Sequence, residues 1–345
     1  MKQGNEGTVV RLDPRQRGLT LVELMVAMAI GLVVAVASVA ALIAARSGYA
    51  AVDASAQLRE NARFSGDIVQ RLVAQAGYDD LILNKATKRC GTFSTDCTTR
   101  DSDVIGFNDA VFTSTTFPPT VTNGSRSAAC GSFGDTSCLN GSDVLIVRYQ
   151  GSSLPNSTTA DGSMINCAGA AEAAPTDAST PESRAYAVFH VRRSDLTGEP
   201  ALMCSYRDST GAWKTEALVQ GVETFQVLYG MDYGTSAVAA GAAATGTDQD
   251  SVSDRFLRAD QIAVTGNTEA TRANWRRVRA LRIGLVLRGA TGSANTSVTP
   301  RTLFPFGERE SSAADTGTRL TVAADGRLRQ ELSFTVALRN RQEIN

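Results

Sequence analysis

Apolar residues form one long, uninterrupted run near the start of the chain. Residues 24–45 contain no ionisable side chain, and Glu23 stands directly before them. As a helix, such a run extends about 33 Å at about 1.5 Å per residue, which is enough to cross a hydrocarbon core of about 30 Å. No later stretch of the sequence has a comparable run. The pattern predicts a single membrane-spanning helix, with the preceding basic segment on the cytoplasmic side.

After the apolar run, the pattern becomes that of an amphipathic helix. Apolar residues recur at helical spacing between residues 64 and 76, and charged residues occupy the other faces. The apolar positions are Phe64, Ile68, Val69, Leu72, Val73 and Ala76. Gly77 is a plausible stop for this helix. We therefore predict one helix from Leu19 to Ala76, about 87 Å long, whose second half packs on a folded domain.

From about residue 85 the pattern alternates with a period of two, as in half-buried strands. The clearest example is residues 328–338, and residues 281–287 and 225–229 repeat it. Further strands are expected at 143–150, 185–193 and 201–207, and surface loops at 168–183 and 234–250. The strands need a hydrophobic backing, which the amphipathic half of the helix can supply. The pattern therefore predicts an α+β fold in which the helix packs on a mostly antiparallel sheet.

The charge balance excludes dedicated nucleic-acid binders. The chain has 34 Lys+Arg against 35 Asp+Glu and a formal net charge of -1, so it lacks the broad positive field that phosphate contacts require. We expect no nucleic acid as a partner. One basic cluster surrounds Trp275, and we expect it to be the solvated flank of a strand or a contact between subunits. Its members are Arg272, Arg276, Arg277, Arg279 and Arg282.

All six cysteines follow the apolar run, which suits an oxidising compartment. They are Cys90, Cys97, Cys130, Cys138, Cys167 and Cys204. Their pairing is left open by the sequence, although the first two and the next two are each close enough to clip a loop. The alternative, a zinc site, needs cysteine pairs separated by two to four residues, and the gaps here are longer. We therefore expect disulfides, which would leave Cys167 and Cys204 as the remaining two.

No residue pattern indicates a catalytic centre. The single histidine, His190, lies in an apolar strand, where a structural role is expected. Asp248, Asp250 and Asp254 have the spacing of a calcium loop, but Val252 occupies a ligand position and the required glycine is missing. We predict no catalytic residue, no metal site and no cofactor, and hence a protein that is not an enzyme.

Glu23 is a carboxylate at the start of a membrane helix, so it needs a compensating partner. Cleavage after Gly18 would supply one, because the new α-amino group of Leu19 could reach Glu23 of a neighbouring copy. A secretory signal cleaved near residues 37–40 explains the sequence less well, because its apolar core would be too long and would have no use for an acid. The other alternative is a simple anchor whose Glu23 reaches the membrane interface.

Residues 18–26, Gly-Leu-Thr-Leu-Val-Glu-Leu-Met-Val, resemble the class III leader junction of type IV pilins and type II secretion pseudopilins. In that family, a prepilin peptidase cleaves after the glycine and N-methylates the next residue. The resemblance implies that Gly18 and Leu19 are the processing site and that Glu23 acts in assembly. Two features depart from the family pattern: Leu19 replaces the usual phenylalanine, and the apolar run has no proline to break the helix.

Three later stretches are similar to the PilW-type minor pilins, namely residues 218–232, 278–288 and 334–341. This resemblance implies a pilin-like α+β fold with disulfide-clipped loops. It also implies a non-enzymatic subunit that primes assembly of a type IV pilus or caps its tip. A J-type minor pseudopilin of a type II secretion system shares the leader and remains an alternative. A membrane-anchored periplasmic binding module or hydrolase is the alternative from another class.

The resemblance also implies a division of the chain and a set of partners. Residues 1–18 would be a cytoplasmic leader that is removed, 19–45 the membrane and assembly helix, 46–77 its amphipathic half, and 78–345 a β-rich periplasmic domain. We expect a single pass through a bacterial inner membrane before incorporation into a surface pilus. The expected partners are other minor and major pilins, the prepilin peptidase, the inner membrane, the pilus assembly platform and a tip adhesin.

Overall fold

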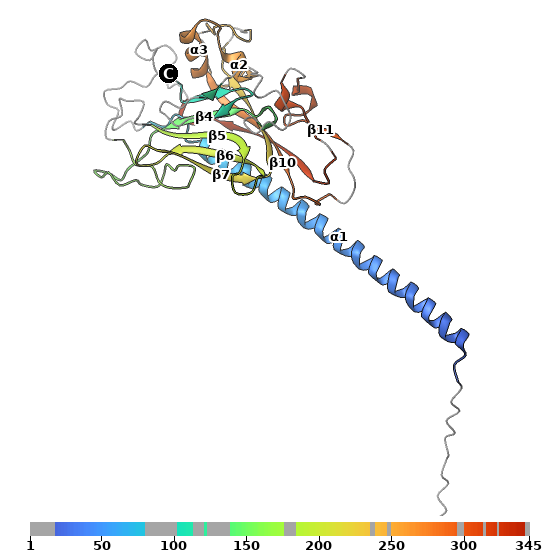
Figure 1. Cartoon of the computed structure of the whole chain (residues 1–345). Helices are drawn as coiled ribbons and strands as arrows, with labels where there is room; N and C mark the ends of the chain where they lie inside the picture. The colour runs from blue at the N-terminus through green and yellow to red at the C-terminus, as the bar shows by residue number, and fades with distance from the viewer. Residues whose placement is uncertain are drawn as a thin grey trace, which may run out of the picture. The chain divides into compact units, whose positions relative to one another are not determined.

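The computed structural model describes residues 18–79, 102–112, 121–122, 139–175, 184–234, 239–246, 250–294, 300–312, 315–322 and 324–341. The chain forms two compact units, residues 1–50 and 51–345 (Figure 1). Helix α1 (Leu21–Val73) contributes to both of them. With 53 residues, it is about 80 Å long.

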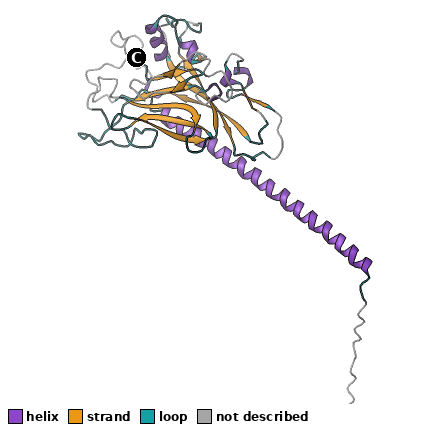
Figure 2. Cartoon of the chain, viewed as in Figure 1, coloured by secondary structure: helices purple, strands orange, loops and turns teal. Residues whose placement is uncertain are grey.

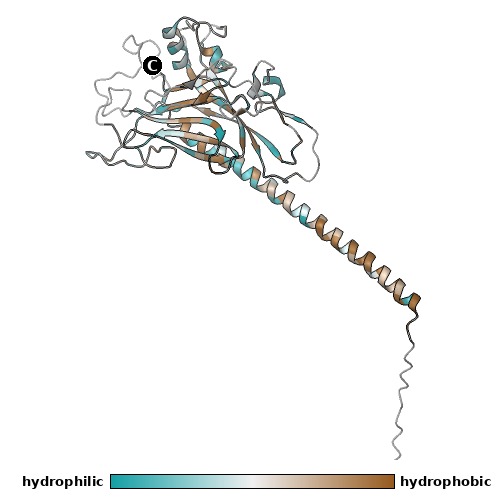
Figure 3. Ribbon diagram, viewed as in Figure 1, coloured by the Kyte–Doolittle hydropathy of each residue, from teal (hydrophilic) through white to brown (hydrophobic). Residues whose placement is uncertain are grey.

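In the first unit, α1 is apolar on all sides. Side chains such as Leu21, Val33 and Ile43 are 74%, 67% and 62% exposed, and Figure 3 shows the brown hydrophobic colour along this part of the helix. Among the described residues, α1 is the one helix long and apolar enough to cross a membrane. A helix that is hydrophobic all round requires an apolar environment, which a membrane or a bundle of similar helices provides.

In the second unit, α1 buries one stripe against the strands. The buried residues of the helix are Leu58, Ala62, Ser65, Val69, Leu72 and Val73. The prediction that Phe64 belongs to this stripe is wrong, because its side chain is 49% exposed while the polar Ser65 is fully buried. Ser65 Oγ is satisfied by donating to the carbonyl oxygen of Asn61 at 2.7 Å. Gly66 lies on the side of the helix that faces β13, since a Cβ atom there would be in van der Waals contact with Leu332 and Phe334 at 3.8 Å.

The strands, orange in Figure 2, form two main antiparallel sheets, which share one hydrophobic core with the second half of α1. The five-stranded sheet has the order β1-β4-β5-β6-β7, with bounds Val104–Phe107, Val144–Tyr149, Ala185–Arg193, Pro200–Arg207 and Trp213–Gln220. The four-stranded sheet has the order β13-β10-β8-β9, with bounds Arg329–Ala337, Val278–Arg288, Val222–Met231 and Arg255–Leu257. The described residues thus form the expected α+β fold, with a helix layered on antiparallel sheets.

Short elements complete the described part of the second unit. Two small hairpins pair β2 (Val111–Phe112) with β3 (Val121–Thr122) and β11 (Arg301–Leu303) with β12 (Leu320–Val322). The helices are α2 (Ala259–Ile262) and α3 (Thr268–Arg276), and the 3-10 turns are η3 (Leu139–Gly141), η5 (Glu308–Glu310), η6 (Thr316–Thr318) and η7 (Arg339–Arg341).

The alternating patterns of β8, β10 and β13 are brought into register by the sheet. Ile283 of β10 lies opposite Phe334 of β13 on one side and opposite Val227 of β8 on the other. Because side chains alternate between the two faces of a sheet, this register gathers the apolar residues of all three strands on one face. The strands predicted at 143–150, 185–193 and 201–207 correspond to β4, β5 and β6.

Three of the five arginines in the basic cluster around Trp275 are buried, so the interpretation as a solvated flank is wrong for these three. Arg276, Arg277 and Arg279 are 7%, 2% and 5% exposed. Arg277 Nη2 donates to the carbonyl oxygen of Gly246 at 2.8 Å, and Arg279 Nε lies 3.4 Å from Asp232 Oδ2. Backbone carbonyls and a buried carboxylate thus take the place of water around these guanidinium groups.

Cys167 and Cys204 form a disulfide, which joins the segment before residue 175 to β6. The other four cysteines, Cys90, Cys97, Cys130 and Cys138, lie outside the described residues.

Candidate functional site

Helix α1 begins with a reciprocal cap made by Thr20 and Glu23. Thr20 donates to Glu23 Oε2 twice, from its backbone N and from its Oγ1, each at 3.0 Å. In return, the backbone N of Glu23 donates to Thr20 Oγ1 at 3.3 Å. This arrangement is a capping box, which satisfies N–H groups that have no partner inside the helix. It explains why the helix starts at Leu21 rather than at the predicted Leu19.

The cap places the Glu23 carboxylate in the first turn of the helix, at the positive end of the macrodipole. Both bonds from Thr20 end on Oε2, so neither of them occupies Oε1. A carboxylate offers about four lone-pair sites, so a further donor can be accepted while the cap stays in place. The carboxylate is therefore held by its own chain and still able to receive an amine from another.

Gly18 and Leu19 lie directly before this cap and are exposed. The side chain of Leu19 is 78% exposed, and a Cβ atom at Gly18 would meet nothing within 4 Å. Both residues have non-helical backbone, which leaves the peptide bond between them accessible to an enzyme. The structure thus places the sequence-predicted processing residues next to the predicted assembly residue.

Thr20 is the residue of this site that sequence analysis missed. The signal was present, because Thr-x-x-Glu before an apolar run is a known indicator of a helix N-terminus. The charge of Glu23 does not by itself indicate a role for the hydroxyl group of Thr20.

His190 lies inside the second unit, in β5. Its side chain is 4% exposed, and its Nε2 lies 3.0 Å from Ser205 Oγ. The ring of Phe112 covers it at a centroid distance of 5.2 Å. Burial, followed by the charge of Arg192, lowers the pKa of His190 to about 3. An imidazole in this position is neutral at physiological pH and has little access to a substrate.

The acidic segment near residue 250 uses its carboxylates to hold its own backbone. Asp250 Oδ1 accepts from the N of Val252 at 2.9 Å, and Asp254 Oδ2 accepts from the N of Tyr233 at 2.7 Å. Asp248 lies outside the described residues. In the part of the chain that the structure describes, no three His, Cys, Asp or Glu side chains are arranged to hold a metal ion.

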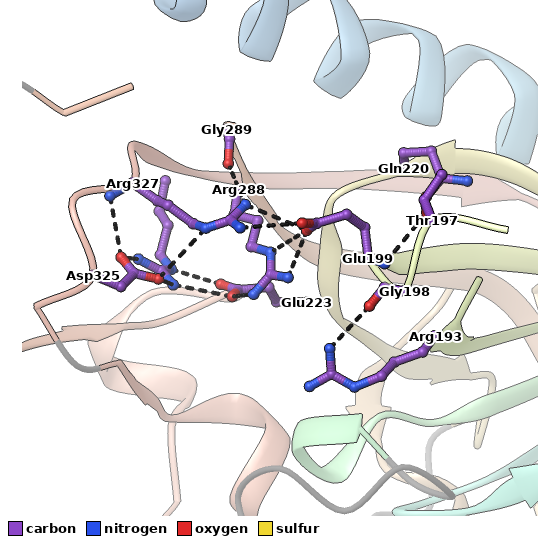
Figure 4. Close-up of polar contacts among 11 residues, drawn as sticks. Arg193, Thr197, Gly198, Glu199, Gln220, Glu223, Arg288, Gly289, Asp325 and Arg327 are labelled. Carbon is purple, nitrogen blue, oxygen red and sulfur yellow. Dashed lines mark hydrogen bonds and ion pairs between the residues drawn. The ribbon is translucent and has the colours of Figure 1, made fainter. Parts of the chain in front are cut away.

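A cluster of three arginines and three carboxylates, not foreseen from the sequence, ties the two sheets together (Figure 4). Arg288 Nη2 lies 2.6 Å from Glu199 Oε2, and its Nη1 lies 3.1 Å from Glu223 Oε1. Arg329 Nε lies 2.6 Å from Glu223 Oε2. Arg327 contacts Glu199, and Arg329 also contacts Asp325. Since the charges balance three against three, the cluster suits a structural role.

This cluster borders an open groove of about 630 Å³ on the second unit. Residues 54, 57, 58 and 61 of α1 form one wall, and Glu199, Gln220, Arg288 and Arg327 contribute to the other. The polar atoms that reach it are largely engaged in the ion pairs just described. The groove therefore shows no group arranged for chemistry.

Comparison with known proteins gives two matches to family models. The model described as Type IV Pilus-assembly protein W matches residues 188–340, from β5 to beyond β13. The prokaryotic N-terminal methylation motif matches residues 13–39, which include Gly18, Leu19 and the Thr20–Glu23 cap. No curated protein matches the chain.

Among solved structures, a type IV-like pilin from Thermus thermophilus is similar to this chain. The two share 11% sequence identity with a TM-score of 0.37, and the alignment covers 83% of this chain and 97% of the other. The evidence for a family comes instead from the two family models, which match the N-terminal and the C-terminal parts of the chain. The methylation motif at the start of the apolar helix and the PilW match over the last strands together support a type IV pilus minor pilin of the PilW type.

Proposed function

We propose that this minor pilin is made as a precursor, cleaved after Gly18, N-methylated on Leu19, and then built into a type IV pilus where it primes assembly or caps the tip. The observation that carries the proposal is the Thr20–Glu23 cap, which is separated from Gly18 only by Leu19 and begins an unbroken apolar helix. This location gives one short segment both the cleavable bond and the acid that assembly uses.

The proposed topology has the leader in the cytoplasm and the ectodomain in the periplasm. Four basic residues in the leader support this orientation: Lys2, Arg11, Arg15 and Arg17. The Cys167–Cys204 disulfide supports an oxidising environment for the ectodomain.

In the proposed mechanism, the self-cap protects Glu23 until a neighbouring subunit arrives. While the helix is in lipid, Thr20 supplies two hydrogen bonds to the carboxylate. During assembly, the methylated amine of Leu19 from another subunit adds a positive charge beside Glu23. Packing among apolar stems replaces lipid contacts with helix contacts and so gives little selectivity. The pair formed by the Leu19 amine and the Glu23 carboxylate then sets the axial register between neighbouring N-terminal helices.

The proposed role involves no chemistry by the ectodomain. Its family is a class of structural proteins, and the buried His190 supports a structural reading of that residue. We propose other minor and major pilins as lateral partners, the prepilin peptidase as the processing enzyme, the assembly platform as the site of extraction, and a tip adhesin as a distal partner. The PilW match favours this role over a J-type pseudopilin or a tethered hydrolase.

Mass spectrometry of the mature N-terminus is the decisive test of processing. We expect a chain that begins with N-methyl-leucine at position 19. Gly18→Arg should leave the precursor uncleaved, because it replaces the glycine of the proposed cleavage junction with a long, charged side chain. A mature chain that begins at Met1, or one cut near residue 40, would overturn the proposal.

Substitutions at Glu23 separate its charge from its role in the cap. Glu23→Val removes both, and we expect normal cleavage and insertion but no incorporation into sheared fibres. Glu23→Gln retains an oxygen acceptor for Thr20 and loses only the charge, so it should also fail to assemble. Incorporation of the glutamine variant at the wild-type level would show that no amine–carboxylate pair is needed.

Deletion of the protein distinguishes the pilus from a secretion system. Loss of surface fibres and twitching with normal exoprotein secretion is expected. Loss of secretion with intact fibres would point to the pseudopilus instead.

A further inference from the structure

The outer edge of β13 has no strand beside it in the four-stranded sheet. Two backbone bonds at its ends fix which groups turn outward. Leu338 N donates to Arg279 O at 2.8 Å, and Gly289 N donates to Leu328 O at 2.8 Å. Hydrogen-bonded pairs recur at every second residue of an antiparallel ladder. Even-numbered residues of β13 therefore bond to β10, and odd-numbered residues point their N–H and C=O groups away from it.

The outward-facing residues are Arg329, Glu331, Ser333, Thr335 and Ala337, and the last four are exposed. Within the described part of the chain, their backbone N–H and C=O groups make no hydrogen bond. Such a row of open donors and acceptors is a template for pairing with another extended chain.

Other strand edges in the described second unit are short, covered or charged. β9 is three residues long. Beyond β9, the edge of β8 is covered by Asp143, whose N donates to Phe225 O and whose Oδ2 accepts from Val227 N, both at 2.8 Å. β7 carries Lys214 and Glu216 on an exposed strand, and its pairing with β6 contains a register shift. These are the devices by which proteins protect sheet edges from association.

β13 lacks such protection over most of its length. It has nine residues in continuous register with β10, without a bulge, and no proline or charge from residue 332 to 337. On its helix side, Leu332 and Phe334 are only partly buried and lie beneath α1 at Gly66. On its other side, Ser333 and Thr335 are small and exposed. A strand that joins this edge would meet apolar groups on one face and small polar groups on the other.

We propose that the outer edge of β13 is a docking site for an extended, uncharged segment of a different pilus subunit, which adds a fifth strand to the sheet. The proposal rests on the function proposed above. The backbone groups of residues 331–337 require a strand as occupant, and the absence of charge from 332 to 337 requires side chains without charge.

A second copy of this chain fits the edge less well. The symmetric way to join two β13 edges is antiparallel, about a two-fold axis perpendicular to the sheet. That axis would make residues 51–73 of α1, which pack on the sheet, run in opposite directions in the two copies. Subunits inserted in one membrane share a direction, so the edge is better suited to a strand from another subunit.

Photo-crosslinking of the full-length chain in piliated cells tests the occupant. A photoreactive phenylalanine analogue at Thr335 should give a product with another pilin, and mass spectrometry should map the contact to one uncharged extended segment. The same analogue at Thr215, an exposed position on β7, is the matched control and should give no such product. Equal yields at the two positions, or a product with a second copy of this chain, would overturn the assignment.

Proline substitutions test the backbone pairing itself. Thr335→Pro removes an outward N–H and leaves the ladder to β10 intact, whereas Phe334→Pro removes an N–H that bonds to β10. We expect Thr335→Pro to lower the cross-link yield from position 333 and fibre incorporation at least about fivefold, with an unchanged unfolding midpoint. Phe334→Pro should instead lower the midpoint. Normal assembly of Thr335→Pro would refute the docking site.

Two further readouts keep the result interpretable. If Thr335→Pro does not fold, Thr335→Lys places a charge at the edge without altering the backbone and should give the same loss of cross-link. Wild-type assembly by Thr335→Lys would count against the proposal. Mass spectrometry of the N-terminus is carried out on the wild type and on each variant. An unprocessed N-terminus in the wild type would refute the proposed function. If only the docking site is wrong, N-methylation remains intact.

Discussion

Thr20 and Glu23 show how one pair of side chains can serve two environments. A threonine N-cap contributes about 1 kcal/mol to helix stability, and here its hydroxyl also donates to a carboxylate at the end of an apolar helix. In the proposed assembly, the carboxylate therefore has a hydrogen-bond donor both before and after a neighbouring amine arrives. Its precise placement depends on a residue that carries no charge.

Thr20→Val tests this dependence with a side chain of the same shape. The valine loses the hydroxyl bond to Glu23 and the bond from Glu23 N, and retains only the backbone bond. We expect a few-fold lower fraction of subunit in sheared fibres, with normal processing, because the carboxylate is held less firmly. Thr20→Ser keeps both hydroxyl bonds and should match the wild type. If valine and serine variants assemble equally well, the cap has no role in assembly.

His190 makes stability depend on pH. Its pKa falls from an ordinary value of about 6.5 to about 3 in the folded protein because it is buried. Between these values the unfolded chain binds a proton that the folded chain does not, so the free energy of unfolding falls as the pH falls below about 6.5. At pH 5 the loss is about 2 kcal/mol. His190→Gln should flatten the pH dependence of the urea midpoint between pH 7 and 5; an unchanged slope would contradict this.

At the scale of elements, the second half of α1 matters through its buried stripe rather than through its hydrophobicity in general. Leu72 is fully buried against the sheets, whereas Phe64 is 49% exposed. We expect Leu72→Ala to lower the free energy of unfolding by about 2–5 kcal/mol, since it leaves a cavity in the shared core. Phe64→Ala removes a larger side chain and should cost under about 1 kcal/mol. Urea unfolding of the detergent-solubilised chain measures both, and a larger effect at Phe64 would contradict the observed face.

The elements that could be predicted from sequence are those with long, one-sided patterns. β10 and β13 alternate over nine or more residues because one face packs on α1. β7 shows no alternation in the sequence because four consecutive residues, 214–217, are exposed and therefore lie on both faces of the strand. β9 is too short to show a period, and α3 buries Asn274 and Arg276, polar residues that carry no hydrophobic signature. At the helix start, the positions of Gly18 and Glu23 follow from local sequence. The cluster of three arginines and three carboxylates around Glu223 depends instead on contacts between strands that are distant in sequence.

At the scale of the whole molecule, the arginine–carboxylate cluster joins parts of the second unit that are far apart in sequence. Glu199 comes from the turn between β5 and β6, Glu223 from β8, Arg288 from β10 and Arg329 from β13. The cluster therefore links the five-stranded sheet to the four-stranded sheet next to the groove beside α1 (Figure 4).

The two glutamates of this cluster differ in exposure, and this difference predicts unequal effects on stability. The side chain of Glu223 is 4% exposed and lies between Arg288 and Arg329, so Glu223→Gln leaves two largely buried guanidinium groups short of a counter-charge. Breaking a buried ion pair from one side costs about 3–5 kcal/mol. The side chain of Glu199 is 36% exposed, and solvent can replace it beside Arg288 and Arg327, so Glu199→Gln should cost about 1 kcal/mol or less.

Urea midpoints of the two variants at low and high salt check this prediction. Salt should change the effect at Glu199 more than that at Glu223, because surface pairs are screened by salt much more than buried pairs. Equal costs at both positions would mean that the cluster is solvated as a whole and does not hold the sheets together.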